Sequence, residues 1–183
     1  MPKGGKQKRV TVKGISTVAL FTAFVAVCSF VSLPLGAVPV TFQSVGIIVA
    51  AGLLGTKKGL LVTLGYLALG VVGLPVFSSF TGGYGVLLSP TGGFLIGFIP
   101  MSFIVGLLTS KWGRDFKGVA LSGVIGTLVL YLFGVIFYAN LHLDGCLSSY
   151  LAAIWICVIP FLVPDLFKIV LSALLVSRLK RFI

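Results

Sequence analysis

Long apolar runs cover nearly all of the chain after residue 13, and short polar, glycine-rich or proline-containing segments separate them. A helix that spans a membrane needs about 20 predominantly apolar residues, and proline ends or kinks a helix because it lacks the backbone N–H donor. The pattern therefore predicts a series of membrane-spanning helices joined by short connections. The first five are expected at residues 14–33, 40–55, 59–74, 91–110 and 119–138.

The last apolar stretch, residues 150–176, contains Pro160 and Pro164 and is therefore expected to break. Proline suits the first position of a helix, so Pro164 is expected to begin a final helix over residues 164–178. This start places Asp165 beside the positive end of the helix dipole. The preceding residues 150–159 are expected to form a separate piece near the outer face. The whole pattern predicts an all-α integral membrane protein, a bundle of six transmembrane helices.

A glycine-rich segment between the third and fourth predicted helices differs from the rest of the chain. Residues 77–85 read FSSFTGGYG, and residues 89–93 read SPTGG. Irregular backbone at membrane depth is tolerated only where protein or a water-filled cavity covers it, because lipid offers no hydrogen-bond partners. The segment therefore predicts a cavity beside it.

The composition excludes a soluble globular domain. Of the 183 residues, 58% are hydrophobic and only 9% are charged, against about 25% charged in ordinary soluble domains. We expect a basic cytoplasmic tail over residues 1–13 and a single membrane domain over residues 14–183, which leaves no room for a nucleotide-binding domain. Any ATPase that works with this chain is therefore expected to be a separate subunit.

The net charge of +11 does not point to a nucleic-acid partner, because the placement of the basic residues indicates membrane topology instead. All but one of the 14 basic residues fall in clusters at the ends of predicted helices, and the connections at 34–42, 76–90 and 140–149 contain none. Basic residues concentrate on the cytoplasmic side of membranes, so both termini are expected in the cytoplasm and those three loops outside. The four basic clusters lie at residues 3–13, 57–58, 111–117 and 178–181.

Asp165 and Lys168 are the most informative residues in the chain. Each is flanked by apolar residues, and a charge at the bilayer centre costs at least about 3 kcal/mol. Their spacing of three puts both on one face of a helix, so both can line the predicted cavity and bind a polar ligand. The alternative is an ion pair that only orients the helix, but a buried pair contributes little stability.

Other polar residues allow two interpretations each. Gln43, near the outward end of the second predicted helix, could bind a ligand or form an interhelical hydrogen bond. Tyr84 could stack on a ligand or anchor at the membrane interface. His142 and Asp144 are expected to be solvated loop residues near the outer surface, and a lone histidine supports neither a metal site nor a nucleophilic mechanism. No catalytic residue is therefore predicted.

A stripe of small residues runs along one face of the first predicted helix, where another helix could approach closely. Its partner could be another helix of the same bundle or a separate protein. The stripe consists of Ser16, Ala19, Ala23 and Ala26.

Four motifs, in this order and spacing, resemble the BioY family, the biotin-binding S components of energy-coupling factor (ECF) transporters. The resemblance extends over residues 17–176. The motifs are PLGAVPVTFQ at residues 34–43, GLPVF at 73–77, GGYGVLLSPTGG at 82–93 and PDLFK at 164–168.

The resemblance implies the S-component fold of six helices in a bacterial cell membrane, with biotin captured from outside. It also implies partners, namely a transmembrane coupling subunit and two ATPase subunits that use ATP, so the chain itself would be no enzyme and would need no cofactor. Asp165 and Lys168 correspond to the pocket residues of the family. The loops 34–43 and 78–84 correspond to the segments that cover the ligand, and Ala19 and Ala23 match the motif that docks on the coupling subunit.

The predicted ligand contacts follow from these correspondences and from the chemistry of biotin. Asp165 can accept hydrogen bonds from the ureido N–H groups, and Lys168 can neutralise the carboxylate of the tail. In the alternative assignment, Lys168 contacts the ureido ring and Asp165 lies at the tail. Phe77, Phe80 and Tyr84 are expected to form apolar walls. Where the family has a polar amide or a small residue for the ureido ring, this chain has Ser79 followed by Phe80. The predicted binding set is Asp165, Lys168, Gln43, Tyr84, Ser79 and Phe77.

Two other functions remain open from the sequence. One is an S component for a different small vitamin. The other is an intramembrane enzyme or proton-conducting channel that uses Asp165 as an acid-base group. An enzyme needs a second catalytic group, and apart from Lys168 no other acid or histidine lies inside a predicted span. A channel usually repeats polar residues along several helices, a pattern that this sequence lacks.

Overall fold

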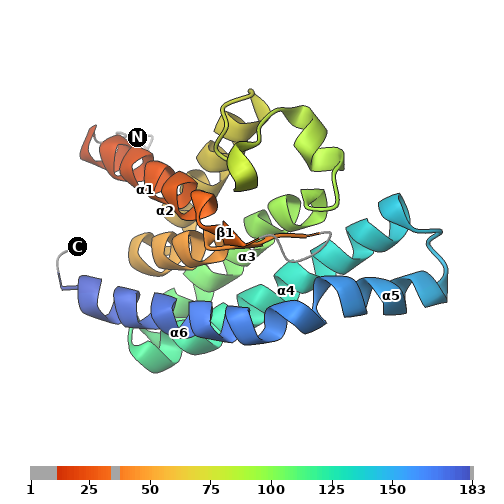
Figure 1. Ribbon diagram of the computed structural model, residues 1–183. Coiled ribbons are helices and arrows are strands. Elements are labelled where there is room, and N and C mark those ends of the chain that lie inside the picture. The colour runs from red at the N-terminus through yellow and green to blue at the C-terminus, as the bar shows by residue number, and fades with distance from the viewer. Residues whose placement is uncertain (1–11, 34–37, 182–183) are drawn as a thin grey trace, which may run out of the picture.

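The computed structural model describes residues 12–33 and 38–181. Most of the predicted basic tail and part of the loop 34–43 therefore lie outside the described residues. Within them the chain is helical apart from one short hairpin and the connecting loops (Figure 1). Five helical stretches are long and apolar enough to cross a membrane, with residues 147–179 taken as one. The prediction of an all-α fold with several membrane-spanning helices is confirmed, whereas the predicted number of six helices is not.

The first helix ends earlier than the sequence predicts. α1 covers Val12–Phe30, and the next residues form β1, Ser32–Leu33, which pairs antiparallel with β2, Val40–Thr41. Leu33 precedes Pro34, and the residue before a proline is disfavoured in a helix. The prediction of helix up to Leu33 was therefore wrong over its last turn.

α2, Gln43–Val71, contains both the second and the third predicted helix. Gly55 is non-helical, with φ 76° and ψ 179°, a conformation that glycine adopts without steric cost. The chain folds back on itself at this point, as the hydrogen bond from the Gln43 amide to the Tyr66 hydroxyl, at 2.6 Å, shows. In one straight helix these two residues would be about 35 Å apart. Residues 43–54 and 56–71 therefore run antiparallel, and the predicted break near Gly55 is confirmed.

The glycine-rich connection after α2 is irregular, as predicted. It contains two 3₁₀ helices, η1 at Ser78–Phe80 and η2 at Tyr84–Leu88, and stands out from the bundle as the yellow-green loop in Figure 1. Its backbone is held to the end of α2, because the Gly83 N–H donates to the Gly70 carbonyl at 2.7 Å. The loop therefore has a defined position beside the helix ends.

The remaining helices are α3, Gly92–Trp112, and α4, Phe116–His142, followed by the pieces of the last apolar stretch. Those pieces are α5, Leu147–Cys157, η3, Ile159–Phe161, and α6, Leu162–Leu179, so the predicted break is confirmed. Pro164 is the third residue of α6 rather than the first, a position in the first turn that proline tolerates. His142 is the last residue of α4 and not part of the loop, but it is exposed.

Glycines let the helix backbones approach closely in the core, whereas α1 lies at its edge. The backbone of Gly106 in α3 packs against Thr56, next to the reversal in α2. Gly59 packs against Ala51 across the reversal itself. In contrast, only 17% of the most apolar window of α1 is buried, against 61% for α2. The core is therefore built mainly from α2, α3, α4 and α6, with Val25 and Ala26 from α1, and most of the rest of α1 is available to lipid or a partner.

Gly59→Ala is expected to destabilise the protein. The new Cβ would lie 2.7 Å from the Cα of Ala51, and overpacking against backbone typically costs about 1–3 kcal/mol. The apparent melting temperature of the detergent-purified protein should fall accordingly. Gly14→Ala is the control, because nothing lies within 4 Å of its Cβ position and alanine favours helix. Equal melting temperatures for the two variants would contradict the packing across the reversal.

Candidate functional site

A cavity lies where the starts of α2, α3 and α6 meet the hairpin, the glycine-rich loop and the middle of α4. The space inside it, including the part that is open to solvent, is about 550 Å³. Its wall combines nine apolar residues with eight polar or charged ones. The main apolar residues are Val38, Phe77, Phe94, Phe98, Leu130 and Phe161.

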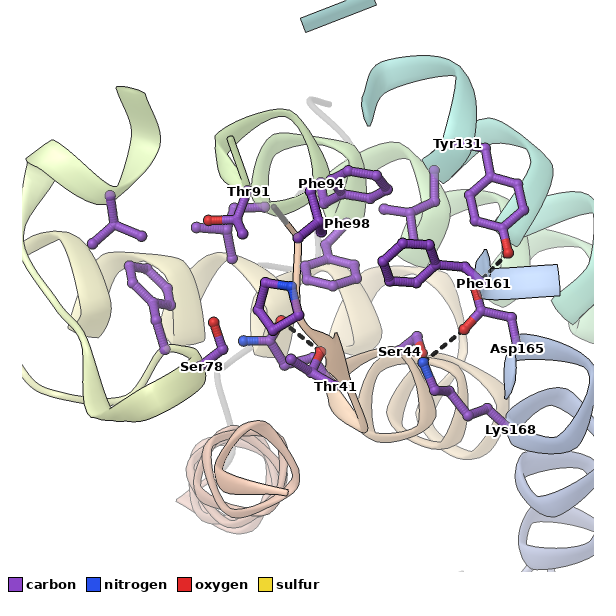
Figure 2. A pocket seen from close by; sticks show the side chains of 17 residues that line it. Thr41, Ser44, Ser78, Thr91, Phe94, Phe98, Tyr131, Phe161, Asp165 and Lys168 are labelled. Carbon is purple, nitrogen blue, oxygen red and sulfur yellow. Dashed lines mark hydrogen bonds and ion pairs between the residues drawn. The ribbon is translucent and has the colours of Figure 1, made fainter. Parts of the chain in front are cut away.

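A buried ion pair with a tyrosine forms one end of this cavity. Asp165 is 7% exposed and Lys168 is 4% exposed. The Lys168 Nζ donates to Oδ1 of Asp165 at 2.6 Å, and the Tyr131 hydroxyl donates to Oδ2 at 2.5 Å. Figure 2 shows the carboxylate between these two donors. The carboxylate therefore has one donor on each oxygen, which is how a buried charge is tolerated.

The two charged side chains of this cluster, Asp165 and Lys168, keep unused hydrogen-bonding capacity. A carboxylate can accept about four hydrogen bonds, and an ammonium group has three donors. Asp165 and Lys168 therefore offer acceptors and donors at the same place in the cavity. Such an arrangement suits a ligand group that itself carries both N–H donors and a carbonyl oxygen.

The sequence assigns Lys168 to one end of the ligand and Asp165 to the other, but the structure brings them together. Because Nζ and Oδ1 are only 2.6 Å apart, both groups lie at the same end of the cavity. A division between head and tail would require the ion pair to separate. Helix geometry explains the contact, since residues three apart share one face.

Gln43 lines the cavity and forms an interhelical hydrogen bond at the same time. Its amide donates to the Tyr66 hydroxyl, and that hydroxyl donates to the Val76 carbonyl at 3.0 Å. Ser29 of α1 donates to the same carbonyl at 2.5 Å. These bonds fix the chain just before Phe77, whose ring is 1% exposed and lines the cavity. The interhelical interpretation of Gln43 is confirmed, and its contact with a ligand stays a prediction.

The loop residues Ser79, Phe80 and Tyr84 lie outside the cavity lining, contrary to expectation. Ser79 and Phe80 have φ values of 56° and 57°, an uncommon conformation for residues other than glycine. Phe80 is 65% exposed and stacks on Phe30 of α1, with ring centroids 4.5 Å apart, and Tyr84 is 76% exposed. Ser78 is the residue of η1 that lines the cavity. Ligand contacts of Ser79 and Tyr84 stay predictions.

The predicted binding set lacks five polar residues that line the cavity, namely Thr41, Ser44, Ser78, Thr91 and Tyr131. Tyr131 lies in the middle of an apolar helix, where a hydroxyl needs a partner, and this signal could have linked it to Asp165. Ser44 follows Gln43 directly, but nothing in the sequence distinguishes it from a surface serine. The aromatic residues Phe94, Phe98 and Phe161 carry no sequence signal beyond apolarity.

The small-residue stripe on α1 points mostly out of the bundle. Ala19 and Ala23 are exposed, whereas Ala26 is 9% exposed and belongs to the core. Packing inside the bundle therefore accounts for Ala26 but not for Ala19 and Ala23. These two alanines leave a smooth outer face on which another helix could lie closely.

Comparisons with known proteins identify the family of the chain. The model of the BioY family matches residues 5–183. The biotin transporter BioY of Thermotoga maritima is 41% identical over 162 residues, which covers 88% of this chain and 92% of the relative. The probable biotin transporter BioY of Pyrococcus horikoshii is 38% identical over 168 residues, which covers 92% of this chain and 96% of the relative.

A solved structure has the same fold. It is the 2.1 Å crystal structure of the S component for biotin from an ECF-type ABC transporter, which superposes with a TM-score of 0.82 at 28% sequence identity. The match covers 98% of this chain and 95% of that one. Because sequence and fold agree over nearly the whole length, the chain belongs to the BioY family.

Proposed function

We propose that this protein is the biotin-binding S component of an ECF-type transporter, which captures biotin from outside for ATP-driven uptake by partner subunits. The observation that carries the proposal is the buried cluster of Asp165, Lys168 and Tyr131 at one end of an apolar cavity. Relatives named as biotin transporters support the choice of vitamin. The chain acts as a binding protein rather than an enzyme and holds no cofactor of its own.

The head group of biotin fits the polar end of the cavity. Its ureido ring has two N–H donors and one carbonyl acceptor, which match the free acceptors of Asp165 and the free donors of Lys168. Hydrogen bonds to charged groups are about twice as strong as neutral ones. The thioether ring and the aliphatic chain then contact aromatic residues such as Phe94 and Phe98.

The carboxylate tail of biotin reaches the other end of the cavity in this arrangement. Ser78 and Thr91 lie there, away from the ion pair (Figure 2). Among the described residues that line the cavity, Lys168 is the one cation, and Asp165 already neutralises it. The tail is therefore held by neutral hydroxyl groups and water rather than by an ammonium group, which revises the role that the sequence suggests for Lys168.

The proposed topology has six spans, with residues 43–54 and 56–71 counted separately and residues 147–179 as one. An even number of spans puts both termini on the same side. The basic connections lie together at one end of the bundle, because Thr56 packs on Gly106 and Lys180 pairs with Asp115. By the positive-inside rule this end is cytoplasmic. The cavity is near the opposite ends of these helices and opens to the outside of the bacterial inner membrane.

The proposed partners are a transmembrane coupling subunit and two ATPases. The exposed alanines of α1, Ala19 and Ala23, support docking of the coupling subunit on this helix. Only 17% of the most apolar window of α1 is buried, which leaves the surface that such a contact needs. No part of the bundle provides a site for nucleotide hydrolysis in this proposal, so ATP is used by the partners alone.

Asp165→Asn is expected to weaken biotin binding at least tenfold. The change removes a charged acceptor of the ureido N–H groups and leaves Lys168 without its buried partner. Isothermal titration in detergent measures the affinity, and gel filtration checks that the variant is folded. Asp115→Asn is the matched control, because that carboxylate is exposed. Unchanged affinity in Asp165→Asn contradicts the proposed function.

Amidation of the biotin tail is expected to change the affinity of the wild type by less than about threefold. Lys168, the one cation among the described lining residues, is already paired with Asp165, and an exposed charge contributes little. The measurement is the same titration, made with biotin and with biotin amide. If Lys168 instead binds the carboxylate, the amide loses at least tenfold in the wild type, and the loss disappears in Lys168→Met. That result would restore the assignment of Lys168 to the tail.

Ala19→Leu combined with Ala23→Leu is expected to remove most of the coupling subunit that co-purifies with the protein, because bulky side chains keep helix backbones apart. Quantitative mass spectrometry of the complex in mild detergent measures the loss. Biotin binding should stay intact, since neither residue lines the cavity. Ala68→Leu, at an exposed position of α2, is the control. Full co-purification of the double variant would contradict docking through this face.

A further inference from the structure

The hydroxyl group of Ser44 is buried in the cavity wall without a hydrogen-bond partner. Ser44 is 7% exposed and lines the cavity, and its Oγ contacts no donor or acceptor among the described residues. Nearly all buried polar groups in proteins have a partner, because an unpaired one loses its bonds to water and gains nothing in return. The hydroxyl is therefore placed where a ligand could complete its hydrogen bonding.

Three other buried hydroxyl groups among the described residues are satisfied within their own helix, whereas that of Ser102 in α3 also lacks a partner. Thr63, Ser122 and Ser172 each donate to the carbonyl four residues earlier, at 3.1, 2.8 and 2.7 Å. Ser44 is the second residue of α2, so the carbonyl four residues before it is not part of the helix. The position of Ser44 at the start of its helix thus leaves the hydroxyl free.

Helix packing puts Ser44 at the level of the ion pair. Gly52 of α2 packs against Val176 of α6, where a Cβ on the glycine would lie 3.1 Å from a Val176 methyl group. Ser44 precedes Gly52 by the same number of residues as Lys168 precedes Val176.

The next contact along the interface shows that the two helices run in the same direction. Ile48, four residues after Ser44, and Ile169, one residue after Lys168, both lie beside Gly123. Counting back from the first contact brings Ser44 level with Lys168, and counting back from the second brings it level with Asp165, so Ser44 lies at the height of the ion pair. Figure 2 shows Ser44 at the end of the cavity that contains Lys168 and Asp165, away from Ser78.

We infer that Ser44 is a ligand-binding residue that donates, together with Lys168, to the carbonyl oxygen of the ureido head group. This inference rests on the proposed function. A carbonyl oxygen has two lone pairs, so one accepts from the Lys168 ammonium and the other from the Ser44 hydroxyl. Asp165 accepts from the N–H groups of the same ring. Ser44 then helps to select a cyclic urea, because a ligand without the carbonyl leaves the hydroxyl unpaired.

The test compares Ser44→Ala with Ser102→Ala. Ser102 is the matched control, since its Oγ is also buried without a partner but does not line the cavity. Without ligand, both variants should keep the wild-type melting temperature or exceed it, because each loses an unsatisfied hydroxyl group. With biotin, Ser44→Ala should bind at least tenfold more weakly in isothermal titration, and Ser102→Ala should bind like the wild type. Ser44→Cys, which keeps the size but donates weakly, should lose affinity as well.

A second ligand identifies the atom that Ser44 contacts. In the biotin analogue with a thiocarbonyl in place of the ureido carbonyl, sulfur is a weaker acceptor, so wild type and Ser44→Ala should bind it with similar affinity. An equal loss for biotin and for the analogue overturns the carbonyl contact. Wild-type affinity of Ser44→Ala for biotin overturns the role of Ser44 and leaves the proposed function intact. Absence of biotin binding by the wild type overturns the proposed function itself.

Discussion

The need to keep a carboxylate charged inside an apolar bundle governs the site. Asp165 lies in the first turn of α6, and its two oxygens accept from Lys168 of the same helix and Tyr131 of α4. Such a buried pair adds little to stability, because the loss of hydration offsets the attraction between the charges. Its presence is better explained by recognition. The pair holds polar groups in a fixed position where a ligand can reach those hydrogen-bonding sites that the protein leaves free.

The arrangement of the helices depends on small residues at their crossings. Gly55 reverses the chain, and Gly59 and Gly106 let backbones meet on either side of this reversal. As a result the start of α2, with Gln43 and Ser44, is placed beside the start of α6. The starts of α2, α3 and α6 therefore form the cavity together with the middle of α4, and the short hairpin and the glycine-rich loop contribute to its wall.

α1 connects the outer surface of the bundle to the loop beside the cavity. Its Ser29 donates to the Val76 carbonyl, which also accepts from Tyr66, and its Phe30 stacks on Phe80. The same helix exposes Ala19 and Ala23 on its other part. A single helix thus contacts the loop beside the cavity at one end and exposes two small residues, Ala19 and Ala23, nearer the other end.

The sequence by itself determined the features that depend on neighbouring residues. Apolar run lengths gave the membrane helices, prolines and glycines gave the breaks near Pro160 and Gly55, and a spacing of three put Asp165 and Lys168 on one face. Only the tertiary structure decided which distant groups meet them, such as Tyr131 on the carboxylate, and that Ser78 rather than Ser79 faces the cavity. The reason is physical: helix geometry fixes the relation of residues a few positions apart, whereas contacts between helices and the direction of loop side chains depend on how the whole bundle packs.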